Sequence, residues 1–156
     1  MLIDIPKTYI ETDTLNYLTY SGNYYPGRNL FDDGHIVLHE NDGTERKCYK
    51  NLDLTIPLLE DIILDLYSYF AQQGAYGFCL LREVYLININ NTHKLHLKSF
   101  QSGEFLVQAE FKNGQTLDIY KGKSEEYANE LIQEYRNAEN RLNERLTNEE
   151  QIKETL

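Results

Sequence analysis

The spacing of hydrophobic residues predicts a helix in the middle of the chain. Between Ile56 and Gln73, apolar residues recur every three or four positions, which is the period of an amphipathic helix. Thr55 is suited to cap this helix, Pro57 fits its first turn, and Gly74 ends it. Because its apolar face is wide, we expect this helix to lie at the centre of the core.

Alternation of apolar and polar residues predicts strands on both sides of this helix. The segment 7–20 is rich in Thr, Tyr and Ile, and indicates a strand or a broken pair of strands. Residues 35–40 and 44–50 flank an Asp-Gly turn and are typical of a hairpin. Residues 78–90 are apolar on both faces of the expected strand, which indicates a central position in the sheet. Three more strands complete a meander: 94–100, 103–111 and 116–122.

A second, longer helix is predicted over 124–146. Ser124 can cap it, and one apolar stripe follows the helical period: Ala128, Leu131, Tyr135, Ala138, Leu142 and Leu146. Such a helix would be about 33 Å long, whereas strands are typically about 20 Å long. From about Leu142 it should therefore either fray or pack on a second copy. In such an antiparallel homodimer, Arg141 and Arg145 would face acids of the neighbour.

These elements predict one α+β domain over residues 1–146. An antiparallel sheet, made of a meander of about four strands plus an N-terminal hairpin, packs on one central helix and is closed by a long C-terminal helix. Residues 147–156 would form a polar C-terminal tail. A chain of 156 residues can bury enough surface to fold without a disulfide or a metal.

Charge and composition narrow the expected partners. The formal net charge is −10, and only the stretch 93–123 is net positive. Such a chain repels phosphate and attracts basic proteins. Its two cysteines, Cys48 and Cys79, form no CxxC motif, which favours buried thiols in a reducing compartment. The opening MLIDIPKT lacks the features of a signal peptide and no apolar run could span a bilayer, so we expect a cytoplasmic protein.

The stretch 20–34 is the main candidate for a binding site. Its three glycines and one proline predict a loop rather than regular structure. The loop would present aromatic side chains within an acidic surround, which suits a basic protein surface. The candidate partner-binding residues are Tyr20, Tyr24, Tyr25, Asp32 and Asp33. Alternatively, the tyrosines fill structural positions in a housekeeping domain.

A second candidate lies on the meander. Lys94, His96, Lys98 and Lys112 are expected to share one sheet face, which could bind an anion such as a ligand's or a nucleic acid's phosphate. Glu104, Glu110 and Asp118 share that face and oppose this interpretation. His35 and His39 would also share a strand face, but a metal site needs three or four converging ligands, so we expect no metal.

Glu110-Phe111-Lys112 resembles the E-x-K element of the PD-(D/E)xK nuclease family. The resemblance covers three residues and implies a metal-dependent nuclease in which Glu110 holds the metal and Lys112 positions water. The further acid that this family places on a preceding strand would have to be Glu83 or Glu104. No nucleophile elbow, phosphate-binding loop or Cys-His arrangement occurs, so we expect a protein that is not an enzyme and has no cofactor.

We therefore expect an acidic, tyrosine-rich interaction protein that inhibits a basic nucleic-acid-handling enzyme. In composition and size it is similar to nucleic-acid-mimicking inhibitors from phage, such as anti-CRISPR proteins, and to immunity proteins and antitoxins. Direct contact with nucleic acid or with a membrane is not expected.

Overall fold

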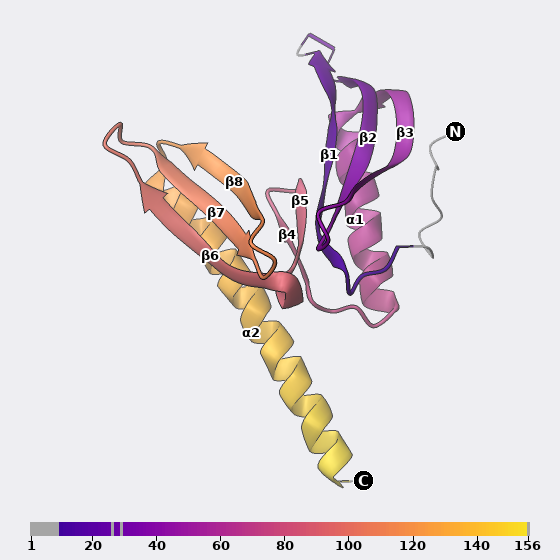
Figure 1. Ribbon diagram of the computed structural model, residues 1–156, viewed down its shortest axis with the longest axis vertical. Coiled ribbons are helices and arrows are strands. Elements are labelled where there is room, and N and C mark those ends of the chain that lie inside the picture. Colours follow the sequence, from indigo (N-terminus) through magenta and orange to yellow (C-terminus); the bar gives the residue numbers. More distant parts are fainter. Residues whose placement is uncertain (1–9, 26, 29, 156) are drawn as a thin grey trace.

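The first half of the chain forms a five-stranded antiparallel sheet with a helix on one face (Figure 1). The computed structural model describes residues 10–25, 27–28 and 30–155, and for 30–32, 50–54 and 155 it describes the backbone alone. In spatial order the strands are β3 (Glu45–Thr55), β2 (Leu30–Glu40), β1 (Leu15–Tyr25), β5 (Tyr85–Asn88) and β4 (Phe78–Leu81).

The helix on this sheet, α1 (Ile56–Gln72), begins and packs as its sequence predicts. The Leu58 N–H donates to the side-chain oxygen of Thr55, and Pro57 lies in the first turn. The buried residues of α1 recur every three or four positions and pack on the sheet to form the first core. The side chains from the helix are Leu59, Ile63, Leu66 and Phe70, and those from the sheet include Leu18, Ile36, Leu38 and Cys48.

The second half of the chain builds a three-stranded sheet on a long helix. The strands β6 (Thr92–Ser99), β7 (Phe105–Phe111) and β8 (Thr116–Gly122) pair antiparallel after a short 3₁₀ turn, η2 (Ile89–Asn91). Helix α2 (Glu125–Thr155) follows, and the Tyr127 N–H donates to Ser124 Oγ at 3.1 Å, which confirms the predicted cap. A second core fills the interface, and includes Val107, Ala109, Phe111, Ile119, Ala128, Leu131 and Tyr135.

The hairpin β4–β5 lies between the two halves and contributes to both cores (Figure 1). Phe78 and Leu86 belong to the first core, whereas Cys79, Leu81 and Ile87 belong to the second. The interpretation of 78–90 as apolar on both faces is therefore right. The expected single strand is wrong, because the chain turns back after four residues.

That turn uses residues that rarely adopt its backbone conformation. Arg82 and Glu83 have φ of 56° and 60°, and the Val84 N–H donates to the Leu81 carbonyl. Two successive left-handed residues are the mark of a type I′ turn, which usually contains Asn or Gly. Since Arg and Glu give no such signal, the turn is not visible in the sequence.

The prediction of a loop over 20–34 is also wrong, because β1 and β2 both run into it. The register between the two strands shifts between Ser21 and Asn23, around Gly22 with φ of 146°. On β2, Asp33 takes a φ of 56°. These irregularities have the character of β-bulges, which admit glycine and left-handed residues without ending the strand.

The predicted α+β class, with its antiparallel strands and long C-terminal helix, is confirmed. The strands divide between two sheets, a grouping that alternation along the sequence does not reveal. Within the described ranges, no helix has the length and apolar character needed to cross a bilayer. The proposed domain boundary at residue 146 stays a prediction.

Helix α2 continues as one helix to Thr155 and extends past the strands (Figure 1). Leu142, from which we expected the helix to leave the core, is buried in the second core. Arg145 stacks on Tyr76 of its own chain, with its Cζ 3.4 Å from the ring centroid, and its Nε lies 3.9 Å from Glu149 Oε1. The part of α2 that could meet a second copy therefore begins near Leu146, which is 47% exposed.

The homodimer through this end stays a prediction, and sedimentation equilibrium checks it. A dimeric mass at high concentration that becomes monomeric in Leu146→Glu would support it, because a buried charge breaks an apolar contact. A monomeric mass for both proteins contradicts it.

The shared hairpin should make the two cores unfold together. Leu86→Ala and Ile87→Ala each remove a fully buried side chain from a different core, and each should cost about 2–5 kcal/mol of unfolding free energy. Leu64→Ala, on the exposed side of α1, should change it by less than about 0.5 kcal/mol. Urea denaturation followed by circular dichroism measures all three. Two separate transitions, each sensitive to one of the two core substitutions, would show that the cores are independent.

Candidate functional site

The far end of the five-stranded sheet brings the tip of the β1–β2 hairpin beside the start of α1. Tyr25 pairs with Leu30 across the hairpin, and Leu30 pairs in turn with Thr55, the cap of α1. Near this tip Tyr24 and Tyr25 are 45% and 46% exposed, although each is a large aromatic side chain. Successive residues of a strand point to opposite faces, so the two rings lie on either side of the hairpin, and half-exposed aromatics of this kind are typical of contact surfaces.

The predicted partner-binding residues do not form one uniform patch. Tyr20 is half-buried and packs against the first core, so part of its ring is structural. Asp33 is exposed, and its backbone carbonyl oxygen lies 2.8 Å from Nδ1 of His35. The backbone of Asp32 pairs with Asn23 and Asp53, but its side chain lies outside what the structure describes.

Two acids outside the predicted partner-binding set lie beside Tyr20. Burial raises the pKa of the Tyr20 hydroxyl, and the charges of Glu60 and Glu83 raise it further, against an opposing effect of Arg82. The pKa of Glu60 is also raised, first by desolvation, then by Glu83 and Asp61 and by a hydrogen bond between the Glu60 and Glu83 carboxyl groups. Glu60 and Glu83 thus form a carboxyl pair in which the charged form of Glu60 is disfavoured.

Arg82, the cation next to this pair in sequence, is engaged on the other side of the turn. Its Nη1 donates to the Ile119 carbonyl at 2.6 Å, and its guanidinium lies over the rings of Tyr120 and Tyr127. It therefore ties the β4–β5 turn to β8 and α2 rather than neutralising Glu83. We call the combined set the acidic tyrosine surface: Tyr20, Tyr24, Tyr25, Asp33, Glu60 and Glu83.

The alternative anion-binding face is balanced by its own acids. Lys94 Nζ lies 3.8 Å from Glu110 Oε2, and His96 Nε2 lies 4.0 Å from the same oxygen. Desolvation, with the nearby Lys94 and Lys98, lowers the pKa of His96 and favours its neutral form. Lys94, His96 and Lys98 lie at alternate positions of β6 and therefore share one face of the sheet, as predicted.

The two remaining lysines of the predicted set are Lys98 and Lys112. Lys98 donates to Gln108 at 3.1 Å, and Gln108 donates to Asp118 at 2.9 Å. Lys112 follows the last residue of β7, where its backbone N–H donates to the Asn91 carbonyl. The face therefore offers a phosphate fewer uncompensated charges than its sequence suggests.

The E-x-K element does not acquire the further acid that a nuclease site requires. Glu83 lies in the β4–β5 turn of the other sheet, and Glu104 lies before β7, where Ser102 Oγ donates to it. Among the side chains described, no three from His, Cys, Asp and Glu converge as metal ligands. His35 is buried, and His39 stacks on Tyr17 with ring centroids 4.0 Å apart.

Comparison with protein-family models, with curated proteins and with solved structures finds no match to this chain.

The raised pKa of Glu60 predicts that the ionised Glu60 side chain makes the folded protein less stable at neutral pH. A folded-state pKa above the ordinary 4.5 means that the folded protein holds this proton more tightly than the unfolded chain. The stability contributed by the protonated group is present below about pH 4.5 and is lost as the pH rises through the folded-state pKa. Glu60→Gln removes this loss, so its melting temperature should exceed that of the wild type at pH 7 and match it at pH 4.

The matched control is Glu130→Gln, an exposed acid on α2 whose removal changes the net charge equally. The control measures the general relief of repulsion in an acidic chain. Equal melting temperatures for the two variants at pH 7 would contradict a loss of stability that is specific to ionised Glu60.

Proposed function

We propose that this chain is an acidic interaction protein that binds a basic surface of another protein through the acidic tyrosine surface. One observation supports this most directly: the exposed Tyr24 and Tyr25 lie near the tip of the β1–β2 hairpin, which pairs with the start of α1, and Glu60 of α1 and Glu83 lie beside Tyr20 of the same strand. The tyrosines supply large, rigid contact area at low entropy cost, while the carboxyl pair supplies charge.

The carboxyl pair is suited to receive a cation from outside the chain. An arginine of a partner would lie between the two carboxyl groups, and its planar fork matches the oxygens of their ionised forms. The positive charge would then offset the part of the raised Glu60 pKa that Glu83 and Asp61 cause, and Glu60 would hold its proton less tightly. Affinity should therefore increase as the pH rises through the raised pKa of Glu60.

The partner is most simply a nucleic-acid-handling enzyme. Such enzymes carry arginine and lysine clusters that bind phosphate, and a protein with net charge −10 is attracted to them at long range. In this role the chain would inhibit its target by covering the phosphate-binding surface, as inhibitors, immunity proteins and antitoxins of this composition do. Two buried thiols support a reducing, cytoplasmic setting.

The test places a photo-crosslinking amino acid at position 25 in the full chain, expressed in its native host. We expect a crosslinked protein with a basic surface, and we expect duplex DNA to displace it when both proteins are purified and mixed. Crosslinking only to acidic proteins, or a complex that DNA does not dissociate, would refute the proposal that the chain occupies the nucleic-acid-binding surface of its target.

Variants of the surface should weaken the purified complex in distinguishable ways. Tyr24→Ala combined with Tyr25→Ala should weaken it at least about tenfold at every salt concentration, since it removes contact area. Glu60→Gln combined with Glu83→Gln should weaken it at low salt and reduce its salt dependence. Glu130→Gln combined with Glu150→Gln, on the exposed side of α2, is the charge-matched control. Loss of binding equal to that of the control would contradict the assigned surface.

A further inference from the structure

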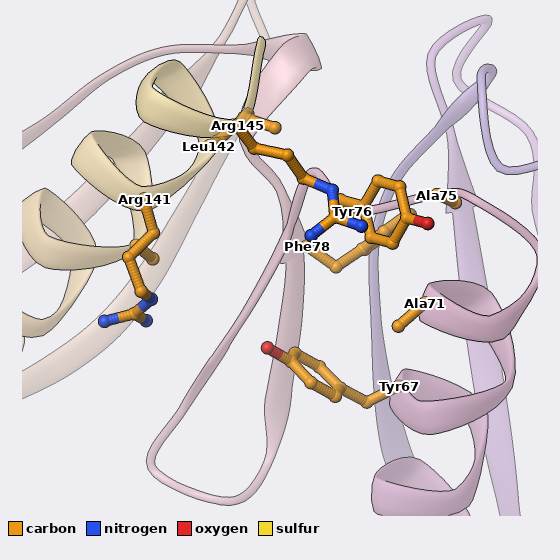
Figure 2. Close-up of a pocket in the computed structure, with 9 residues that line it drawn as sticks. Tyr67, Ala71, Ala75, Tyr76, Phe78, Arg141, Leu142 and Arg145 are labelled. Atoms are coloured by element: carbon orange, nitrogen blue, oxygen red, sulfur yellow. The ribbon is translucent and has the colours of Figure 1, made fainter. Parts of the chain in front are cut away.

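A cavity of about 210 Å³ lies between α1, the segment before β4, and α2, away from the acidic tyrosine surface (Figure 2). Its walls are partly built from small side chains, Ala71 and Ala75 on one side and Ala138 on the other. The buried side chains of Phe78 and Leu142 also line it. Small residues on two facing elements keep this space open, because larger side chains would fill it.

Two arginines of α2 line this cavity, one turn apart. Figure 2 shows Arg145 lying across Tyr76, and its Cζ is 3.4 Å from the ring centroid. Stacking fixes the plane of a guanidinium and leaves the N–H groups at its edge available to an acceptor. Arg141 lies one turn earlier and forms no ion pair with any residue that the structure describes.

The space continues beyond Arg141. A second hollow of about 260 Å³ shares Tyr67, Ala138 and Arg141 with the first and reaches Cys79. The charge of Arg141 acts on that buried thiol, whose pKa burial raises to about 12 and Arg141 opposes. The two hollows together are large enough for more than an inorganic ion, and ligand sites of several hundred Å³ are common.

We propose that this cavity binds a small organic anion: a carboxylate or phosphate group held by Arg145 and by Arg141, whose exposed side chain, which points away from Arg145 in Figure 2, turns toward the bound group, with a flat apolar body against Tyr67 and the alanine wall. The guanidinium groups match the planar oxygens of such a head group, and aromatic and apolar lining suits a flat body. A nucleoside monophosphate and an aromatic carboxylate share this chemistry.

Two features oppose binding and set its expected strength. The net charge repels any anion at long range, but this effect is screened beyond about 10 Å at ordinary salt. Glu149 lies 3.9 Å from Arg145 and competes for its guanidinium. Removing Glu149 should therefore tighten binding, by about twofold for an exposed pair.

The experiment is an NMR titration of the full chain with three probes: adenosine 5′-monophosphate, benzoate and inorganic phosphate. We expect saturable shifts of the Ala71, Tyr76 and Ala138 signals with one or both organic anions, and the one that binds identifies the source of the ligand. Inorganic phosphate, which has the head group alone, should bind at least about tenfold more weakly. Equal affinity for inorganic phosphate, or no saturable shift with either organic anion at millimolar concentration, overturns the proposal.

Variants distinguish this cavity from general charge effects. Arg141→Ala should weaken binding about tenfold or more, because a hydrogen bond to a charged group is lost. Arg136→Ala removes the same charge from an exposed position of the same helix and should change affinity by less than about twofold. Ala71→Leu fills the cavity and should abolish binding with both arginines intact, and Glu149→Gln should tighten it. A weakening by Arg136→Ala equal to that of Arg141→Ala contradicts the assigned site even if Ala71→Leu does not fold.

Discussion

The fold depends on a short hairpin that must be buried on both sides. Strands β4 and β5 have four residues each, and their side chains alternate between the first core and the second. A two-stranded hairpin of this size is not stable alone in water, so it needs both helical layers around it. Each layer in turn would expose apolar surface without the hairpin. We therefore expect the two halves to stabilise each other, although their sheets are separate.

Side-chain amides hold this arrangement where the hairpin leaves the first sheet. Asn88 Nδ2 donates to the Thr12 and Leu15 carbonyls, and Asn91 Nδ2 donates to the Asp13 and Leu15 carbonyls. These bonds satisfy backbone acceptors where the chain changes sheets, and leaving them unpaired would be costly. The same hairpin also positions both proposed sites, since its turn carries Glu83 and its first residue, Phe78, lines the cavity beside Arg145.

Periodicity predicts the elements of this protein better than their grouping. The helical period of 56–73 and the alternation in 94–122 depend on local burial, and both are confirmed. The turn at Arg82 and Glu83 is imposed by burial on either side of the hairpin, and local sequence does not encode it. Glycines at 22 and 34 suggest a loop, yet the strands continue through bulges. For the candidate site, composition selected Tyr24, Tyr25 and Asp33, but Glu60 and Glu83 meet only through the tertiary fold.

The two cysteines can report on the opening of the two cores, because one thiol lies in each. Cys48 lies in the first core and Cys79 in the second, and both thiols are buried. A thiol reacts as its thiolate, and burial raises the pKa of Cys79 to about 12, so the native state protects it. Reaction with an alkylating reagent then requires opening of the surrounding core. The chain thus carries one internal reporter for each core, and the two labelling rates record whether the halves open together or in turn.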